Sequence, residues 1–347
     1  MDNEQANAAD SARPEYAQAM QAEAAYWADI QQRRLEENEL TPELDLRRCE
    51  ALGRRRLRDP YGGPGYVFDP ALRRYCLPMR KLYALLDEAA ARGGRGLELG
   101  CGAGWLSLEL ARAGVEMDAY DISAGALEIA ARLAREDPWQ ASRAVLRYYV
   151  ADMNVLELPP AQYDTIVVWC SMHHCARPRH VLAQINRALK PTGRAYLVDN
   201  TGGCRLGRIL GTLLYTLTPT AEPLGGKWRT LWARVSAKLL RRPPPAPGKP
   251  AHASPMEGIC RFDALLALAR EELRVERVTT VHAFCQDVVR YTVLPTPLRQ
   301  PLLFLLGLAD YALTRAGLLR GHHGIIRASK RPHPQAMPNP KAFDRCG

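Results

Sequence analysis

The stretch LELGCGAGW, residues 97–105, decides the fold of this 347-residue chain. It joins a short apolar strand to an amphipathic helix through three glycines, Gly100, Gly102 and Gly104. Glycines at such a junction let the backbone approach a ligand closely, and the first turn of the helix offers free N–H groups. A dinucleotide-binding loop has its third glycine where Trp105 stands here, so we expect a ligand without a pyrophosphate and with a charged amino-acid end near Glu98. The alternative is a tight turn that binds nothing.

Strands and helices alternate along the chain around this loop. We predict strands at 95–100, 115–122, 146–152, 163–171, 193–200, 273–284 and 322–331, and helices at 15–34, 77–92, 103–114, 123–136, 179–190, 261–272 and within 286–319. Ser123 is the expected N-cap of its helix, and Pro191 is expected to stop another. This alternation predicts an α/β fold, with a parallel sheet covered by helices on both faces.

Acidic residues stand at the ends of the first three strands, at Glu98, Asp121 and Asp152. An acid at the tip of the second strand is where a ribose diol is held by paired hydrogen bonds, which suits Asp121. Asp152 is placed to meet an adenine amino group. A single such aspartate is often only a turn former, but three in consecutive strands indicate a nucleoside site.

Taken together, residues 93–200 resemble a class I S-adenosylmethionine-dependent methyltransferase. The resemblance rests on LELGCGAG, YDIS, VADM, YDTIVVWCSMHHC and RALKPTGRAYLVDN, and it covers about a third of the chain. It implies a Rossmann-like, parallel-rich seven-stranded sheet and S-adenosylmethionine as the methyl donor, with no metal expected. It also implies which residues bind that cofactor: Glu98, Gly100, Gly102, Gly104, Asp121, Ile122, Asp152, Met153 and Cys170.

The sequence WCSMHHC, residues 169–175, ends the fourth strand, and three interpretations of it are open. Cysteine and histidine are zinc ligands, but the spacing matches no closed site and adjacent histidines do not readily face one ion. Core filling suits the cysteines better than the imidazoles, which need partners when buried. We favour a catalytic role in which His173 or His174 faces the acceptor and removes its proton, with His173 slightly preferred.

The remainder of the chain is expected to select the acceptor. We divide it into a disordered tail (1–14), an N-terminal helical extension or lid (15–92), the cofactor-binding core (93–200), an inserted cap (201–260), the rest of the sheet (261–331) and a flexible tail (332–347). Candidate acceptor-pocket residues are Tyr26, Trp27, Asn200 and Trp228, with Asp199 beside them at the end of the fifth strand. A weaker resemblance of SPMEGI (254–259) points to bacterial biosynthesis of secondary metabolites, glycans or lipids.

Composition limits the alternatives. The net charge of +10 is compatible with RNA, but no RNA-binding module is recognisable and no N/D-P-P-Y/F motif follows the fourth strand. The nine cysteines lack regular spacing and the N-terminus is polar, so we expect reduced thiols and a cytoplasmic protein. The apolar runs at 209–221 and 300–309 are too short to span a bilayer, which leaves peripheral lipid contact open. We therefore predict a methyltransferase with a small-molecule acceptor, oxygen favoured, acting as a monomer or homodimer; the alternatives are an RNA methyltransferase and a cofactor-binding protein without transfer activity.

Overall fold

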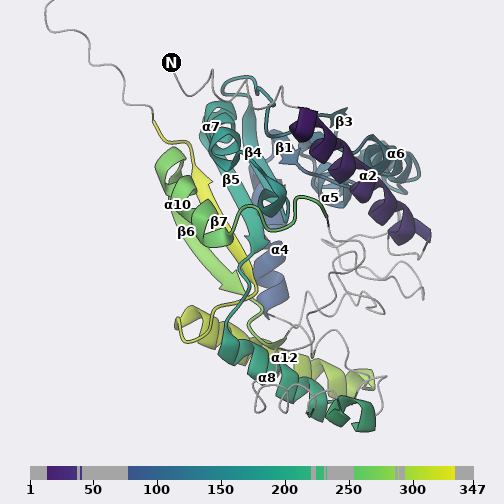
Figure 1. Cartoon of the computed structure of the whole chain (residues 1–347), viewed down its shortest axis with the longest axis vertical. Helices are drawn as coiled ribbons and strands as arrows, with labels where there is room; N and C mark the ends of the chain where they lie inside the picture. Colours follow the sequence, from purple (N-terminus) through teal and green to yellow (C-terminus); the bar gives the residue numbers. More distant parts are fainter. Residues whose placement is uncertain are drawn as a thin grey trace, which may run out of the picture.

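The computed structural model describes residues 14–36, 40, 77–219, 224–229, 232, 254–285, 288 and 294–332 (Figure 1). The expected disordered tail at 1–14 and flexible tail at 332–347 lie outside these ranges except for Pro14 and Pro332. The turn-rich sequence at 59–70 also predicts a loop, and the proline-rich sequence at 241–250 predicts an exposed linker; both lie outside the described residues. Within the described part of the chain, no helix combines the length and the hydrophobicity needed to cross a bilayer.

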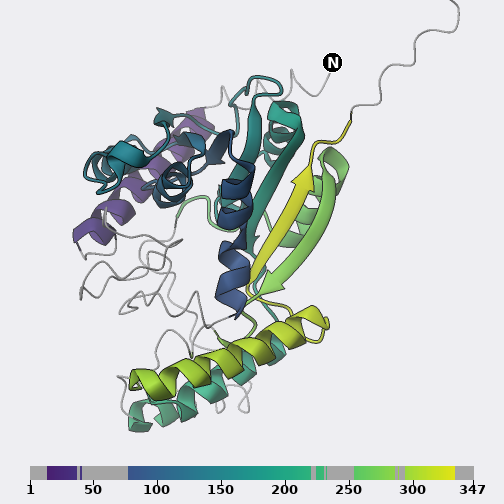
Figure 2. The ribbon, with the colours of Figure 1, turned by 180° about the vertical axis from the view of Figure 1, so that it is seen from behind.

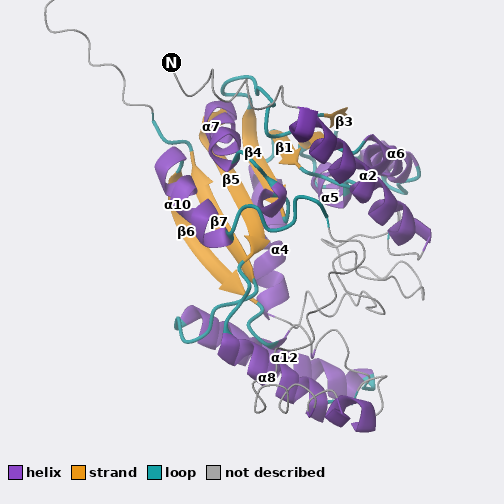
Figure 3. Ribbon diagram, in the orientation of Figure 1, coloured by secondary structure: helices purple, strands orange, loops and turns teal. Residues whose placement is uncertain are grey.

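Seven strands form one sheet in the order β3-β2-β1-β4-β5-β7-β6 (Figure 3). Their bounds are β1 Arg95–Leu99, β2 Glu116–Asp121, β3 Leu146–Val150, β4 Tyr163–Trp169, β5 Leu189–Asn200, β6 Arg274–Val281 and β7 His323–Ser329. The strands β3, β2, β1, β4 and β5 pair in parallel, and β7 runs antiparallel to both β5 and β6. The expected Rossmann-like, parallel-rich sheet is confirmed, and its strand order reverses between β1 and β4.

The helices are α2 Pro14–Glu36, α4 Leu77–Arg92, α5 Trp105–Arg112, α6 Ala124–Arg135, α7 Pro178–Ala188, α8 Arg205–Leu217, α10 Phe262–Glu272 and α12 Thr296–Arg315, with single 3₁₀ turns η1 Gln140–Ser142 and η2 Met172–His174. The Ser123 hydroxyl caps α6 by accepting from the Ala126 N–H at 3.3 Å, as predicted. The boundaries with the largest errors are the start of β5 and the end of β6. Helix α7 ends at Ala188, before Pro191, so β5 begins at Leu189 and not at 193, and β6 ends at Val281 and not at 284. Leu189 leaves the helix because it is fully buried and pairs with Tyr163 of β4.

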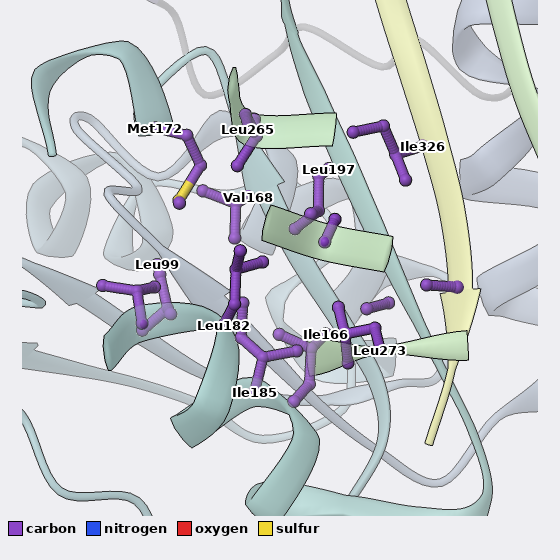
Figure 4. Packing of buried hydrophobic residues seen from close by; sticks show 14 of the residues in the cluster. Leu99, Ile166, Val168, Met172, Leu182, Ile185, Leu197, Leu265, Leu273 and Ile326 are labelled. Carbon is purple, nitrogen blue, oxygen red and sulfur yellow. The ribbon is translucent and has the colours of Figure 1, made fainter. Parts of the chain in front are cut away.

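Two apolar clusters hold helices on the two faces of the sheet. On one face, side chains of α4, α5 and α12 pack against β2, β4 and β5 in a cluster that includes Leu86, Leu110 and Leu303. On the other face, α7 and α10 pack in a second cluster, in which Leu182 and Leu265 lie close to Val168 (Figure 4). Because β4 and β5 are covered on both sides, each contains a continuous apolar segment, IVVW at 166–169 and AYLV at 195–198.

The N-terminal helix and the insertion complete the framework. Helix α2 lies against α6. A Cβ added at Gly125 of α6 would lie only 2.9 Å from the Cβ of Ala28, so a glycine at this position lets the two helices pack closely. Figure 2 shows α8 and α12 at one end of the molecule, away from α2. The two ends of the insertion at 201–260 therefore lie in different places. Helix α8 lies at that end of the molecule, whereas Ser254 and Met256 form hydrogen bonds with Glu23 of α2.

Candidate active site

A cavity of about 320 Å³ lies at the carboxyl ends of β1, β2 and β4, where the strand order reverses. Open α/β sheets bind ligands at this position because the loops on either side diverge there. The cavity is lined by the glycine loop, the ends of β2, β3 and β4, and one face of α2. It brings together most of the predicted residues: Gly100, Gly102, Asp121, Ile122, Asp152, Met153, Cys170, His173, His174 and Trp27.

The glycine loop has a backbone conformation that residues with a side chain rarely adopt. Gly100, Gly102 and Gly104 have φ values of 71°, 53° and 70°, in the left-handed region. A Cβ at Gly102 would lie 3.0 Å from Nε2 of Gln31 on α2, so this glycine also permits α2 to approach the loop. The loop therefore presents bare backbone to the cavity, as a close-fitting ligand requires.

Asp121 joins the tip of β2 to the glycine loop. Its Oδ2 accepts from the Gly102 N–H at 2.7 Å, and its Oδ1 accepts from the Ser123 N–H at 2.8 Å. Burial raises the pKa of Asp121, and the N–H donors only partly offset this effect. Each carboxylate oxygen can accept a second hydrogen bond, and Asp121 lines the cavity, so it could accept from a ribose diol there.

Asp152 is shared between the core and α2. It accepts at 2.5 Å from the Tyr16 hydroxyl and at 2.8 Å from both the N–H and the side-chain amide of Asn154. Burial and the neighbouring Asp152 together raise the pKa of Tyr16, which therefore stays a hydrogen-bond donor. Met153 and Ile122 add apolar walls on either side. This part of the cavity suits a flat, partly polar ring.

Glu98 lies outside the cavity lining, which corrects its expected contact with the cofactor. It is 1% exposed, beneath the loop, and accepts a short hydrogen bond from the Ser107 hydroxyl of α5. Burial raises its pKa to about 8, so the carboxyl is largely protonated at neutral pH. Gly104 likewise faces Tyr148 and Ala130 rather than the cavity. Both residues support the loop from behind.

The end of β4 is held in a strained backbone that carries the two histidines. Cys170 has φ 51° without being glycine, and its N–H donates to the Val198 carbonyl at 2.7 Å. The Ser171 hydroxyl lies 3.0 Å from the Gly100 carbonyl, which links this turn to the glycine loop. The turn η2 then places His173 and His174 on the cavity wall.

His173 forms a pair with Asp199 at the end of β5. Its Nδ1 lies 2.6 Å from Asp199 Oδ1, and its backbone N–H donates to Oδ2 at 3.0 Å. Asp199 is 2% exposed, and its Oδ1 can accept from Nδ1, so in the neutral imidazole Nε2 is the acceptor atom. Burial lowers the pKa of His173, but the hydrogen bond and charge of Asp199 outweigh it, and the net pKa lies above its usual value.

His174 is oriented from α2 and from the insertion. Its Nδ1 lies 3.1 Å from both Glu23 Oε1 and Ser254 Oγ. Burial opposes ionisation of Glu23, yet hydrogen bonds from His174, Ser254 and Trp27 bring its pKa below the usual value. Trp27 stands edge-on to the His174 ring at 5.3 Å. The second histidine therefore shapes the pocket and connects α2 to it.

Glu257 faces both imidazoles from the insertion. Its carboxylate oxygens lie 3.7 Å from His173 Nε2 and 3.6 Å from His174 Nε2, and the three potential ligand atoms lie within 4.8 Å of one another. Adjacent histidines can thus face one point, contrary to expectation, and this spacing is compatible with a cation. The Asp199 and Glu23 hydrogen bonds account for the ring orientations without one.

Three expected acceptor residues lie outside the cavity lining: Tyr26, Asn200 and Trp228. Tyr26 packs edge-on against Trp27 at 5.4 Å, and exposed Asn200 accepts from the Gly202 N–H. Trp228 is 51% exposed beside the end of α8, because Lys227 is buried against the last carbonyls of that helix.

Several cavity residues were missed in the sequence. They include Met20, Glu23, Gln31 and Arg34 of α2, together with Ser171 and Glu257. The spacing of the α2 residues places them on one helical face, so polar residues on an otherwise apolar stripe were the available signal. The contribution of Glu257 depends on how the insertion folds back, which no local pattern encodes.

Comparisons with known proteins agree with this arrangement. A family described as "Methyltransferase domain" matches residues 97–197. The mitochondrial ubiquinone biosynthesis O-methyltransferase of Schizosaccharomyces pombe is 34% identical over 101 residues, 29% of this chain and 36% of that protein. The chain thus spans about a third of that relative's length. An uncharacterised methyltransferase of Mycobacterium bovis is 32% identical over 146 residues, 42% of this chain and 71% of that protein.

Among solved structures, geranyl diphosphate C-methyltransferase of Streptomyces coelicolor is similar with a TM-score of 0.41 and 14% identity, covering 73% of this chain and 79% of that one. The family match spans the glycine loop and β5, and the Mycobacterium bovis relative is matched over most of its length. The glycine loop, Asp121 at the tip of β2 and the strand order are those expected for a protein that binds S-adenosylmethionine. The chain therefore belongs to the class I S-adenosylmethionine-dependent methyltransferases.

Proposed function

We propose that this protein transfers the methyl group of S-adenosylmethionine to a hydroxyl group of a small molecule. The observation that carries the proposal is the Asp199–His173 pair, because in the neutral imidazole it holds the proton on Nδ1 and makes Nε2 the proton acceptor on the cavity wall. An oxygen acceptor must lose a proton during attack, whereas a thiolate or a neutral amine has less need of a general base. The relative from Schizosaccharomyces pombe, whose name describes an O-methyltransferase, supports the same choice of atom.

The cavity residues fit the cofactor. Gly100 and Gly102 would receive its amino-acid end, Asp121 its ribose hydroxyls, and Ile122, Asp152 and Met153 its adenine ring. Bound there, the cofactor supplies an electrophilic methyl carbon. Glu98 is protonated and buried, so it would keep the loop in shape rather than bind the ammonium group.

His173 acts on the acceptor in this proposal. Its Nε2 takes the hydroxyl proton as the oxygen attacks, and the imidazolium that forms is flanked by Asp199 at 2.6 Å and Glu257 at 3.7 Å. Two carboxylates on either side stabilise that charge, so proton transfer becomes more favourable. Because the charge appears only during the reaction, the pair lowers the barrier instead of strengthening ground-state binding.

The acceptor would lie between α2 and the two histidines. Trp27 and Met20 give this side of the cavity an apolar surface, whereas Glu23 and Glu257 are acidic. Such a lining suits a neutral, partly aromatic or aliphatic hydroxyl compound and repels an anionic one. The buried hydrogen bonds of Glu23 with Ser254 and Met256 hold α2 and the insertion together over this space.

Two measurements test the proposal in order. S-adenosylhomocysteine should raise the melting temperature of the wild type, and Asp121→Ala should abolish this increase. The matched control is Asp118→Asn, since Asp118 is equally buried on the same strand but pairs with Arg95 and Arg147 outside the cavity. Labelled cofactor should then transfer its methyl group to phenols, quinols or sugar hydroxyls and not to RNA. Cofactor binding with transfer only to thiols, amines or RNA would refute the oxygen assignment while leaving the cofactor site intact.

A further inference from the structure

Helix α8 exposes an unbroken apolar stripe. Leu206, Ile209, Leu213 and Leu217 recur every three or four residues and are between 44% and 72% exposed. The opposite side of the helix is firmly packed: a Cβ at Gly207 would lie 2.5 Å from the Ala283 carbonyl oxygen. The stripe is therefore a fixed surface of the fold and not the face of a loosely attached helix.

Helix α12 carries a second stripe of the same kind. Leu298, Phe304, Leu305 and Leu308 are between 43% and 63% exposed. The other side of α12 is buried, where Leu303 joins the core cluster that also receives Leu210 of α8. Both helices lie at the end of the molecule opposite α2 (Figures 1 and 2), so neither stripe belongs to the active-site cavity.

The exposed charged side chains that the structure describes on these two helices are all basic. Arg205 and Arg208 of α8 and Arg315 of α12 are exposed. Along the described residues of the two helices, the sole carboxylate is Asp310, which is fully buried and accepts from the N–H groups of 283–285. The sequence that follows α8 has no acidic residue between Glu222 and Glu257, but it contains the basic segment LLRR at 239–242.

A short helical turn at 224–229 adds an interfacial aromatic residue. Lys227 is buried and donates to the Thr218 carbonyl at 2.5 Å, which fixes this turn to the end of α8. Leu224 and Trp228 then remain 59% and 51% exposed at this end of α8. Tryptophan and leucine next to arginine are the residues that amphipathic segments place at a lipid–water boundary.

We propose that the surface formed by α8, the 224–229 turn and α12 docks on a membrane that contains anionic lipid. Apolar stripes alone would suit another protein equally well, but the exposed charges described on α8, the turn and α12 are all arginine, which favours a negatively charged, fluid partner. Docking would bring the enzyme to the lipid phase without any spanning helix. This inference does not depend on the acceptor atom or on His173.

The test is vesicle flotation with the full chain. Binding is expected to equimolar phosphatidylcholine and phosphatidylglycerol, to be much weaker with phosphatidylcholine alone, and to fall as salt increases. Arg205→Gln with Arg208→Gln should weaken binding about 25-fold, since each basic residue near an anionic surface contributes about fivefold. Leu213→Gln with Leu305→Gln should weaken it at least about tenfold, because both leave the apolar face. Val145→Gln with Val155→Gln, exposed apolar positions elsewhere, is the matched control.

Retention of the melting-temperature increase with S-adenosylhomocysteine will show that each variant is folded. Failure of the wild type to bind anionic vesicles would overturn the proposal, as would equal binding by the variants of α8 and α12 and by the control. A concentration-dependent dimer that Leu213→Gln and Leu305→Gln dissociate, without vesicle binding, would assign the surface to a second copy of the chain instead.

Discussion

Asp199→Asn tests the active-site pair most directly, because the structure leaves the new amide no good orientation. Asp199 now accepts three N–H groups: Nδ1 of His173 and the backbone N–H of Asn200 at Oδ1, and the backbone N–H of His173 at Oδ2. An asparagine has one oxygen, so its NH₂ must face a backbone N–H in either orientation. Leaving a buried donor unsatisfied costs about 1–3 kcal/mol, and the free energy of unfolding should fall by that amount.

The same substitution acts on His173. If the amide NH₂ takes the Oδ1 position, it donates to Nδ1 and moves the imidazole proton to Nε2, the atom that must accept a proton. In either orientation the negative charge is lost, so the pKa of His173 should fall. Because general-base catalysis contributes about 10²–10⁴-fold, methyl transfer to a hydroxyl should slow by at least about 10²-fold. The acid limb of the rate profile should move to lower pH.

Nitrogen-15 NMR of the imidazoles measures tautomer and titration without an acceptor, and His173→Gln assigns the signal. The control is Asp164→Asn at the other end of β4, where the carboxylate pairs with Lys190 outside the cavity. Cofactor binding should be unchanged in both variants. An Asp199→Asn protein in which His173 titrates as in the wild type, and in which methyl transfer is undiminished, would refute the proposed role of the pair.

Three further outcomes are expected. In the folded protein Glu98 has a pKa of about 8, so it keeps a proton that the unfolded chain releases above a pH of roughly 4.3. Between these two pH values the free energy of unfolding of the wild type should therefore fall by up to about 1.4 kcal/mol per pH unit relative to that of Glu98→Gln. Equal pH dependence of the two proteins in denaturation experiments would contradict a buried, protonated carboxyl. Gly102→Ala should weaken S-adenosylhomocysteine binding in calorimetry, whereas Gly114→Ala, which has a similar left-handed φ but open space around it, should cost only stability; equal affinities would remove the glycine loop from the site. Dialysis against a chelator should leave hydroxyl methylation intact, and a loss that a divalent cation restores would assign His173, His174 and Glu257 to that cation.

Local patterns predicted much of the part of the cavity that we assign to the cofactor. Gly100 and Gly102 were recognisable because only glycine adopts their φ values at no cost, and Asp121 because a parallel sheet aligns the ends of its strands. These signals are short-range, since a turn or strand end is specified within a few residues. Glu98 shows their limit, because its position at a strand end was correct but its side chain points beneath the loop to Ser107.

The sequence by itself determined the alternating order of strands and helices, the glycine loop and the place of the two histidines after the fourth strand. These features depend on periodicity and turn chemistry, which act over neighbouring residues. Tertiary structure alone decided which partners those residues meet. The pairing of His173 with Asp199 joins adjacent strands, the contact of His174 with Glu23 joins residues 151 positions apart, and Glu257 arrives from a distant insertion. Such contacts depend on the packing of whole elements against each other, which is a property of the complete sheet and its helices rather than of any one segment.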